Sequence, residues 1–211
     1  MPLLPHDEPV DLHALLSGSG PIELEIGPGR GMFLIARATV RPDVRLLGIE
    51  VRRKWAAVVD ERLRRLGMVE RARVVCDDAR QLLPRLGPSG SVATIFLHFP
   101  DPWWKRRHAK RSVLSDALLD AATRLLGECG ELFVQTDVPE RAAAYEQALR
   151  LRPELEPAGD EGGSARLAAN PYGARSNREK RVEADGLPVH RVRFRRVARP
   201  NPPQGRERAE N

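Results

Sequence analysis

The sequence has 211 residues, of which 41% are hydrophobic and 30% charged, with a formal net charge of +6. These values are typical of a globular protein with one core, and no apolar run approaches the ~20 residues of a membrane span. The start, MPLLPHDEPV, lacks the basic and apolar regions of a secretory signal. The cysteines Cys76 and Cys129 lie far apart, so we expect free thiols in a cytoplasmic protein without a metal site.

The positive charge is unevenly distributed. Residues 1–170 contain 24 Lys and Arg and 24 Asp and Glu, whereas residues 171–211 contain 11 and 5. A second, compensated basic cluster lies at residues 105–111. Local basic patches on a balanced body favour an anionic macromolecular partner, and the alternative is a solvated tail in an arginine-rich chain.

The predicted elements alternate along most of the chain. Residues 1–20 are expected to form an N-terminal arm, followed by a strand at 22–26, a glycine turn at 27–31 and a helix from 32 to near 42. Strands at 45–51, 72–76, 92–99 and 131–136 then alternate with helices at 54–66, 80–86, 113–126 and 139–151, with Gly130 as a helix stop. Five β-α units in series predict an α/β fold with a doubly wound, mostly parallel sheet.

The pattern changes after Pro153. Residues 153–177 resemble a loop, and residues 189–197 alternate, with Arg191, Arg193 and Arg195 on one face. This alternation predicts a final antiparallel strand with a basic face. We expect residues 21–198 to form a single domain and residues 199–211 a disordered tail.

The first strand ends in the sequence EIGPGRG, an acid followed by a glycine turn. In an open α/β sheet, ligands bind at the carboxyl ends of the strands, and Gly27 and Gly29 let the backbone approach the ligand closely. Glu50 ends the second strand and is placed to accept hydrogen bonds from ribose hydroxyls.

The acids of this turn indicate which nucleoside cofactor binds. A dinucleotide fingerprint requires glycine at the position of Met32, and the carboxylate of Glu25 suits an ammonium rather than a phosphate. S-adenosylmethionine has no phosphate and carries an amino acid end. Asp78, after the third strand, is placed to hold the adenine amino group. The pattern therefore favours S-adenosylmethionine over a dinucleotide, with a plain turn and surface acids as the alternative.

The stretch FPDPWWKRRHAKR follows the fourth strand and lies at the same edge of the sheet. It contains the tetrad Asp101-Pro102-Trp103-Trp104, which resembles the N/D-P-P-aromatic tetrad of amino-group methyltransferases except that Trp103 replaces the second proline. Asp101 is the acid expected nearest to the transferred methyl group. The following cations suit phosphates, and an exposed tryptophan suits stacking on a base.

With these motifs together, the chain resembles the bacterial tRNA (guanine-N7)-methyltransferase family. The resemblance rests on EIGPGRG, GIEV, the DDA at residues 77–79, FPDPWWKRRHAKR, and FVQTD ending at Asp137. It implies a Rossmann-like class I methyltransferase with a seven-stranded, mostly parallel sheet and a C-terminal antiparallel strand. It also implies methylation of guanine 46 in the tRNA variable loop.

The resemblance further implies roles for individual residues. Glu25, Glu50, Asp78 and Asp101 would bind S-adenosylmethionine, with Asp101 also the catalytic acid, while Lys105 and Asp137 would contact the RNA. The substrate segment of the family, Thr-Lys-aromatic-Glu, reads Ser176-Asn177-Arg178-Glu179 here. This departure alters the residues available to recognise guanine, although an arginine can also stack on a base.

The chemistry requires no general base, because N7 of guanine has a free lone pair and no proton to lose. We expect an in-line displacement in which Asp101 orients guanine and balances the charge formed on the ring. Two alternatives remain: a methyltransferase of the same fold acting on an exocyclic amino group, and a non-catalytic RNA-binding module. The tryptophan in place of the second proline and the basic run after it argue against the exocyclic amino-group methyltransferase. The complete set of acids, Glu25, Glu50, Asp78 and Asp101, argues against the non-catalytic module. The protein is expected to be a monomer or a homodimer.

Overall fold

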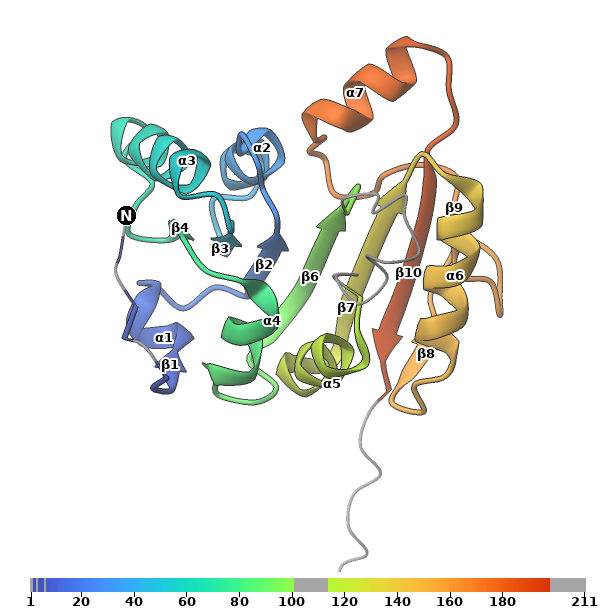
Figure 1. Ribbon diagram of the computed structural model, residues 1–211, viewed down its shortest axis with the longest axis horizontal. Coiled ribbons are helices and arrows are strands. Elements are labelled where there is room, and N and C mark those ends of the chain that lie inside the picture. The colour runs from blue at the N-terminus through green and yellow to red at the C-terminus, as the bar shows by residue number, and fades with distance from the viewer. Residues whose placement is uncertain (1, 3, 6, 101–113, 198–211) are drawn as a thin grey trace, which may run out of the picture.

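A three-layer α/β architecture is present in the computed structural model, which describes residues 2, 4–5, 7–100 and 114–197 (Figure 1). The main sheet has the strand order β4-β3-β2-β6-β7-β10-β8. In chain order its strands are β2 (Ile22–Ile26), β3 (Arg45–Ile49), β4 (Ala72–Val75), β6 (Val92–His98), β7 (Leu126–Thr136), β8 (Leu155–Pro157), β9 (Arg166–Leu167) and β10 (His190–Arg196). The helices are α1 (Leu12–Leu15), α2 (Met32–Val40), α3 (Arg53–Arg65), α4 (Ala79–Leu82), α5 (Asp116–Leu125), α6 (Pro139–Arg150) and α7 (Asn177–Ala184).

The sheet has the predicted direction pattern. Strands β4, β3, β2, β6 and β7 are parallel, and β10 pairs antiparallel with β7 and β8. The expected seven-stranded, mostly parallel sheet with a C-terminal antiparallel strand is therefore confirmed along this path. The two-residue strand β9 adds an eighth member by pairing with β10.

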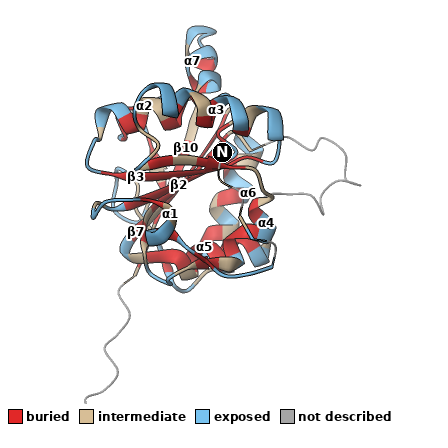
Figure 2. Ribbon diagram, turned by 90° about the vertical axis from the view of Figure 1, so that its left-hand side faces the viewer, coloured by how far each residue is buried: buried red, intermediate tan, exposed pale blue. Residues whose placement is uncertain are grey.

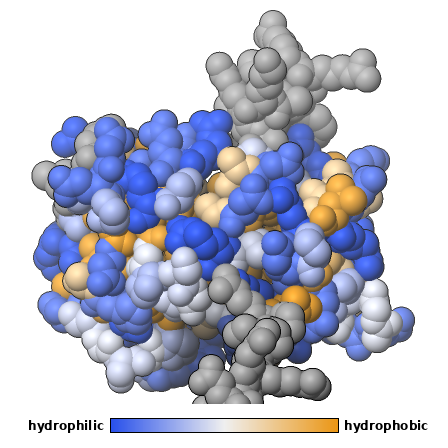
Figure 3. Space-filling model, turned by 90° about the horizontal axis from the view of Figure 1, so that it is seen from below, coloured by the Kyte–Doolittle hydropathy of each residue, from blue (hydrophilic) through white to orange (hydrophobic). Residues whose placement is uncertain are grey.

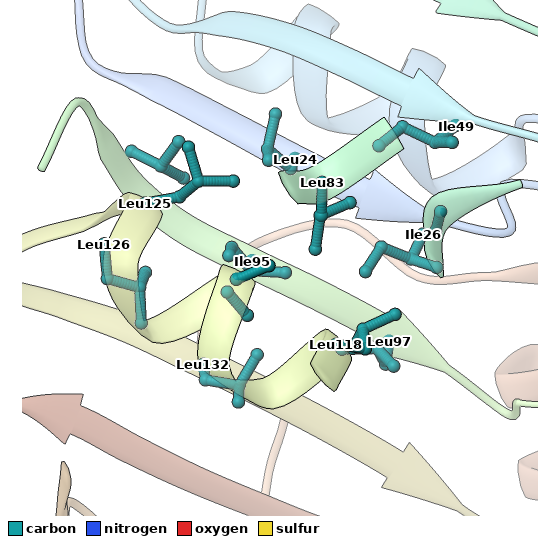
Figure 4. Close-up of a cluster of buried hydrophobic side chains, with 14 of the residues drawn as sticks. Leu24, Ile26, Ile49, Leu83, Ile95, Leu97, Leu118, Leu125, Leu126 and Leu132 are labelled. Carbon is teal, nitrogen blue, oxygen red and sulfur yellow. The ribbon is translucent and has the colours of Figure 1, made fainter. Parts of the chain in front are cut away.

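Different cores fill the two sides of the sheet. On one side, leucine, isoleucine and valine side chains of β2, β6 and β7 pack against α5 and the segment around Leu83 (Figure 4). On the other side, α2 and α3 cover β3 and β4 with a second aliphatic cluster (Figure 2). Strand β6, which is buried on both faces, is apolar at nearly every position and therefore reads as a continuous apolar run in the sequence.

The second side changes character over β6 and β7. Phe33 from α2 packs there with Phe96 and Phe133, and Tyr172 closes the cluster from the segment after β9. The Tyr172 hydroxyl donates to Glu131 at 2.9 Å, and burial together with this carboxylate raises the pKa of Tyr172. Aromatic packing therefore supports the sheet directly below the carboxyl ends of β6 and β7.

Two local predictions were wrong. Gly130 does not stop a helix: α5 ends at Leu125, and Gly130 lies inside β7, where an added Cβ would meet the Val92 carbonyl oxygen at 3.0 Å. The glycine therefore permits a close approach of two backbones. The segment 153–177 is not only a loop, because β8 and β9 lie within it. Strands this short leave no detectable alternation.

The expected basic face of β10 also requires correction. The strand alternates as predicted, but Arg191 is buried and pairs with Glu179 at 3.0 Å and with Glu183 at 2.8 Å. Arg193 and Arg195 both lie within 3.5 Å of Glu131. The charges of this face are therefore neutralised within the fold, so that it is not an open positive surface.

The N-terminal segment packs on the same side of the sheet as α5. Its short strand β1 (Val10–Asp11) pairs with β5 (Leu86–Gly87), and Leu12 and Leu16 are fully buried. The molecule seen from the amino ends of the parallel strands is mostly hydrophilic, with scattered apolar patches (Figure 3). Among the helices that the structure describes, none is long and apolar enough to cross a membrane.

Candidate active site

The glycine turn between β2 and α2 lies at the carboxyl edge of the sheet. Gly27, Gly29 and Gly31 all have positive φ values, of 73°, 55° and 71°. A Cβ on Gly27 or Gly29 would meet no atom within 4 Å, whereas one on Gly31 would lie 2.4 Å from Cγ1 of Val59 in α3. The first two glycines therefore leave an open backbone surface, and the third is required by helix packing.

Glu50 connects the glycine turn to the end of β3. Its side chain is buried, and Oε2 accepts a hydrogen bond from the Gly29 amide at 2.9 Å. Oε1 accepts from the backbone and side-chain nitrogens of Arg52. Because a carboxylate oxygen has two acceptor sites, Oε2 retains capacity for a ligand hydroxyl.

Glu25 is held at the end of β2 by a residue of the next strand. Its Oε1 lies 2.9 Å from Nδ1 of His98 in β6, and both side chains are 2% exposed. The other oxygen, Oε2, has no hydrogen-bond partner within the described part of the chain. A buried, unpaired carboxylate oxygen is costly and suits a ligand that brings donors, such as an ammonium.

Asp78 follows β4 and caps α4. Its carboxylate accepts from the Arg80 amide and pairs with the Arg80 guanidinium. These hydrogen bonds hold the pKa of Asp78 below its ordinary value. The carboxylate therefore stays ionised, and both of its oxygens are paired with Arg80.

These residues fit the cofactor that the sequence predicts. The structure brings Glu25, Glu50 and Asp78 to the carboxyl ends of neighbouring strands, with the open backbone of Gly27 and Gly29 between the first two. Acceptors for an ammonium, a ribose and an adenine amino group thus occur in strand order, and no cationic side chain of the described residues bonds to Oε2 of Glu25.

A second group of predicted residues gathers beyond β7, below α7. Arg178 donates to Asp137 at 2.6 Å, and its guanidinium carbon lies 5.8 Å from the centre of the Phe99 ring. Phe99 has a φ of 49°, a left-handed conformation that an aromatic residue rarely adopts. Arg178 therefore links α7 to the residues that follow β6 and β7. Helix α7 lies above the ends of these two strands in Figure 1.

The other members of the segment 176–179 have different surroundings. The Ser176 hydroxyl caps α7 by accepting from the Glu179 amide, and Asn177 is exposed. The Glu179 side chain is fully buried and bonds to Gln135, Asn170 and Arg191. The structure thus makes Glu179 the centre of a buried polar network.

Several predicted residues lie outside the described part of the chain. These are Asp101, Pro102, Trp103, Trp104 and Lys105, the basic cluster that ends at residue 111, and the predicted tail 199–211. Phe99 and Pro100, which precede them, are described, and the Phe99 amide donates to the Gln135 carbonyl at 2.8 Å. The segment with Asp101 therefore departs from the carboxyl end of β6, next to β7.

Two residues of the site were missed at the level of sequence. His98 holds Glu25, and Gln135 holds Glu179 through its Nε2 at 3.1 Å. A histidine at the end of the apolar run 92–99 was the available signal for the first. Within the described ranges, no group of three or more His, Cys, Asp or Glu side chains is arranged to hold a metal ion.

Solved structures of low sequence identity share this fold. TrmN from Thermus thermophilus aligns with a TM-score of 0.58 at 19% identity, covering 84% of this chain and 44% of that chain. The aminoglycoside resistance methyltransferase NpmB1 aligns with a TM-score of 0.52 at 22% identity, covering 84% and 87%. These likenesses establish the class I methyltransferase fold.

Sequence comparisons are more specific. The methyltransferase family model Methyltransf_4 matches residues 19–192. A tRNA (guanine-N(7)-)-methyltransferase of Myxococcus xanthus is 35% identical over 91% of both chains. One of Anaeromyxobacter dehalogenans is 44% identical over 83% of this chain and 85% of its own. Because the similarity extends over nearly the whole fold and not only over the glycine turn, the chain belongs to the tRNA (guanine-N(7)-)-methyltransferase family.

Proposed function

We propose that this protein transfers the methyl group of S-adenosylmethionine to N7 of a guanine in tRNA. The observation that carries the proposal is the family membership over most of the chain, joined to a glycine turn flanked by buried Glu25 and Glu50. We further propose guanine 46 of the variable loop as the target. The methyltransferase domain would comprise residues 21–198, after an arm at 1–20 and before a tail at 199–211.

The residues of the glycine turn would hold the cofactor. Glu50 accepts the ribose hydroxyls, Glu25 the ammonium of the amino acid end, and Asp78 the adenine amino group, while Gly27 and Gly29 allow close backbone contact. When bound, S-adenosylmethionine supplies an electrophilic methyl group on a positively charged sulfur. The acids thus place complementary charge around a cationic ligand.

The reacting end depends on Asp101, which follows β6. Its carboxylate would orient the guanine and stabilise the positive charge that forms on the ring during methyl transfer. Lys105, Asp137 and residues 176–178 would hold the RNA, and the buried Glu179 would support this segment from within the fold. Arg178 stands where the family has an aromatic residue, and its planar guanidinium offers both stacking and hydrogen bonding to a base.

The direct experiment is incubation with total tRNA and methyl-labelled S-adenosylmethionine, followed by nucleoside analysis. N7-methylguanosine makes the chain cleavable after borohydride and aniline, and the cleavage position tests guanine 46. A methylated exocyclic amino group would leave the chain intact and support the first alternative. Failure to bind S-adenosylmethionine would support a non-catalytic RNA-binding module.

The charge role of Asp101 has its own test. Asp101→Asn keeps the shape and removes the charge, so the turnover number should fall at saturating cofactor and tRNA. Normal turnover would exclude the charge role. From the tRNA substrate we infer a cytoplasmic location. We further propose that the active form is a monomer or a homodimer and that the reaction uses no metal ion.

A further inference from the structure

The pair formed by Glu25 and His98 is buried at the carboxyl ends of β2 and β6. The two residues lie on adjacent strands, with 2.9 Å between Oε1 of Glu25 and Nδ1 of His98. Each side chain is 2% exposed. Burial of an acid and an imidazole together is costly unless their polar atoms are satisfied.

Their polar atoms are only half satisfied within the described part of the chain. Oε1 of Glu25 and Nδ1 of His98 bond to each other, whereas Oε2 of Glu25 and Nε2 of His98 have no partner there. The histidine tautomer with its proton on Nδ1 donates to the carboxylate and leaves Nε2 without a proton. A pair that served only the core would not leave a buried carboxylate oxygen without a donor.

The imidazole ring cannot easily turn away from Glu25. Its centroid lies 4.1 Å from that of Phe33, 5.7 Å from that of Phe96 and 6.0 Å from that of Phe133. Rings on α2, β6 and β7 thus confine it, because close-packed interiors permit few alternative rotamers. The direction of the Nδ1–H bond is therefore set by the aromatic cluster.

We propose that His98 is a positioning residue for the cofactor. By donating to Oε1, it fixes the Glu25 carboxylate so that Oε2 receives the ammonium of the amino acid end of S-adenosylmethionine. This inference rests on the proposed function. Its physical basis is the same as for ligand residues in metal sites, where a neighbouring hydrogen bond orients the group that contacts the ligand.

Different residues hold the two ends of the ligand. His98 acts only through Glu25, whereas the ribose is assigned to Glu50, which is held independently by Gly29 and Arg52. Loss of the His98 donor should therefore weaken ligands that carry the ammonium and leave ligands without it unchanged. A general disturbance of the pocket would weaken both.

The test uses calorimetry with S-adenosylhomocysteine, which has the amino acid end, and 5′-methylthioadenosine, which lacks it. In His98→Asn the amide nitrogen takes the place of Nδ1, whereas in His98→Gln it extends toward the place of Nε2, and His98→Leu has no donor. We expect His98→Leu and His98→Gln to weaken the binding of S-adenosylhomocysteine roughly 10- to 100-fold. The affinity of His98→Asn for S-adenosylhomocysteine should stay within about threefold of the wild-type value. All variants should bind 5′-methylthioadenosine about equally.

The Asn and Gln variants are both polar, so their comparison does not depend on whether the Leu variant folds. Equal binding of S-adenosylhomocysteine by the Asn and Gln variants would overturn the inference, as would parallel loss of both ligands. If the wild type binds S-adenosylhomocysteine and methylates tRNA, such results reject only the role of His98. If the wild type binds neither ligand, the assignment of the cofactor fails, and this inference fails with it.

Discussion

Replacing Glu179 by alanine should lower the free energy of unfolding by about 3 kcal/mol or more. The family resemblance assigns Glu179 to the substrate site, yet its side chain is fully buried. Its oxygens accept from Gln135 at 3.1 Å, from Asn170 at 3.1 Å and from Arg191 at 3.0 Å. Alanine would leave these donors without their acceptor.

The magnitude follows from the pairing of Arg191. Removing one partner of a buried ion pair typically costs about 3–5 kcal/mol, because the other charge remains buried. Arg191 keeps a second acid, Glu183, at 2.8 Å, so the lower end of this range is expected for the charge. The amide donors of Gln135 and Asn170 add to the loss, since a buried donor without a partner costs about 1–3 kcal/mol.

Urea unfolding at constant m-value measures this change, and Ser176→Ala provides a matched control on the same helix. The Ser176 hydroxyl caps α7, and loss of such a cap costs about 1 kcal/mol. Glu179→Ala should therefore be clearly less stable than Ser176→Ala. An alanine variant with the stability of the wild type but without tRNA methylation would refute the reasoning and support direct contact of Glu179 with guanine.

Two further predictions concern the cofactor turn. Gly31→Ala should lower stability by roughly 2–4 kcal/mol through its positive φ and its contact with Val59, and Val59→Ala should restore part of this loss. Gly29→Ala has open space around its Cβ, so it should lower the free energy of unfolding by only about 1–2 kcal/mol but weaken the binding of S-adenosylhomocysteine. Urea unfolding measures the first effect and calorimetry the second. Another prediction concerns the pH dependence of stability. Arg80 lowers the pKa of Asp78 in the folded state, so the ionised carboxylate stabilises the fold at pH values above its ordinary pKa of 3.8. This stabilisation is lost as the pH falls below 3.8. The stability of Arg80→Ala should therefore fall less steeply than that of the wild type on acidification, and equal slopes would contradict the assignment.

The order of elements and the cofactor turn were predictable from local pattern. Strands buried on both faces favour apolar runs such as residues 92–99, and positive φ values favour glycine, so both leave signals in consecutive residues. Gly27 and Glu50 were identified in this way. The strands β8 and β9 were not, because they pair through three and two residues and depend on β10 for their position.

The sequence by itself determined the fold class, the acids around the cofactor turn and the family, because each depends on residue types at fixed spacing. Only the tertiary structure decided which charges remain available. Arg191 and Glu179 are twelve residues apart and look like separate surface charges, yet they form a buried pair. His98 looks like part of an apolar strand, yet it holds Glu25 across the sheet. Long-range pairing sets the burial and the partner of each charge, and no local pattern encodes either.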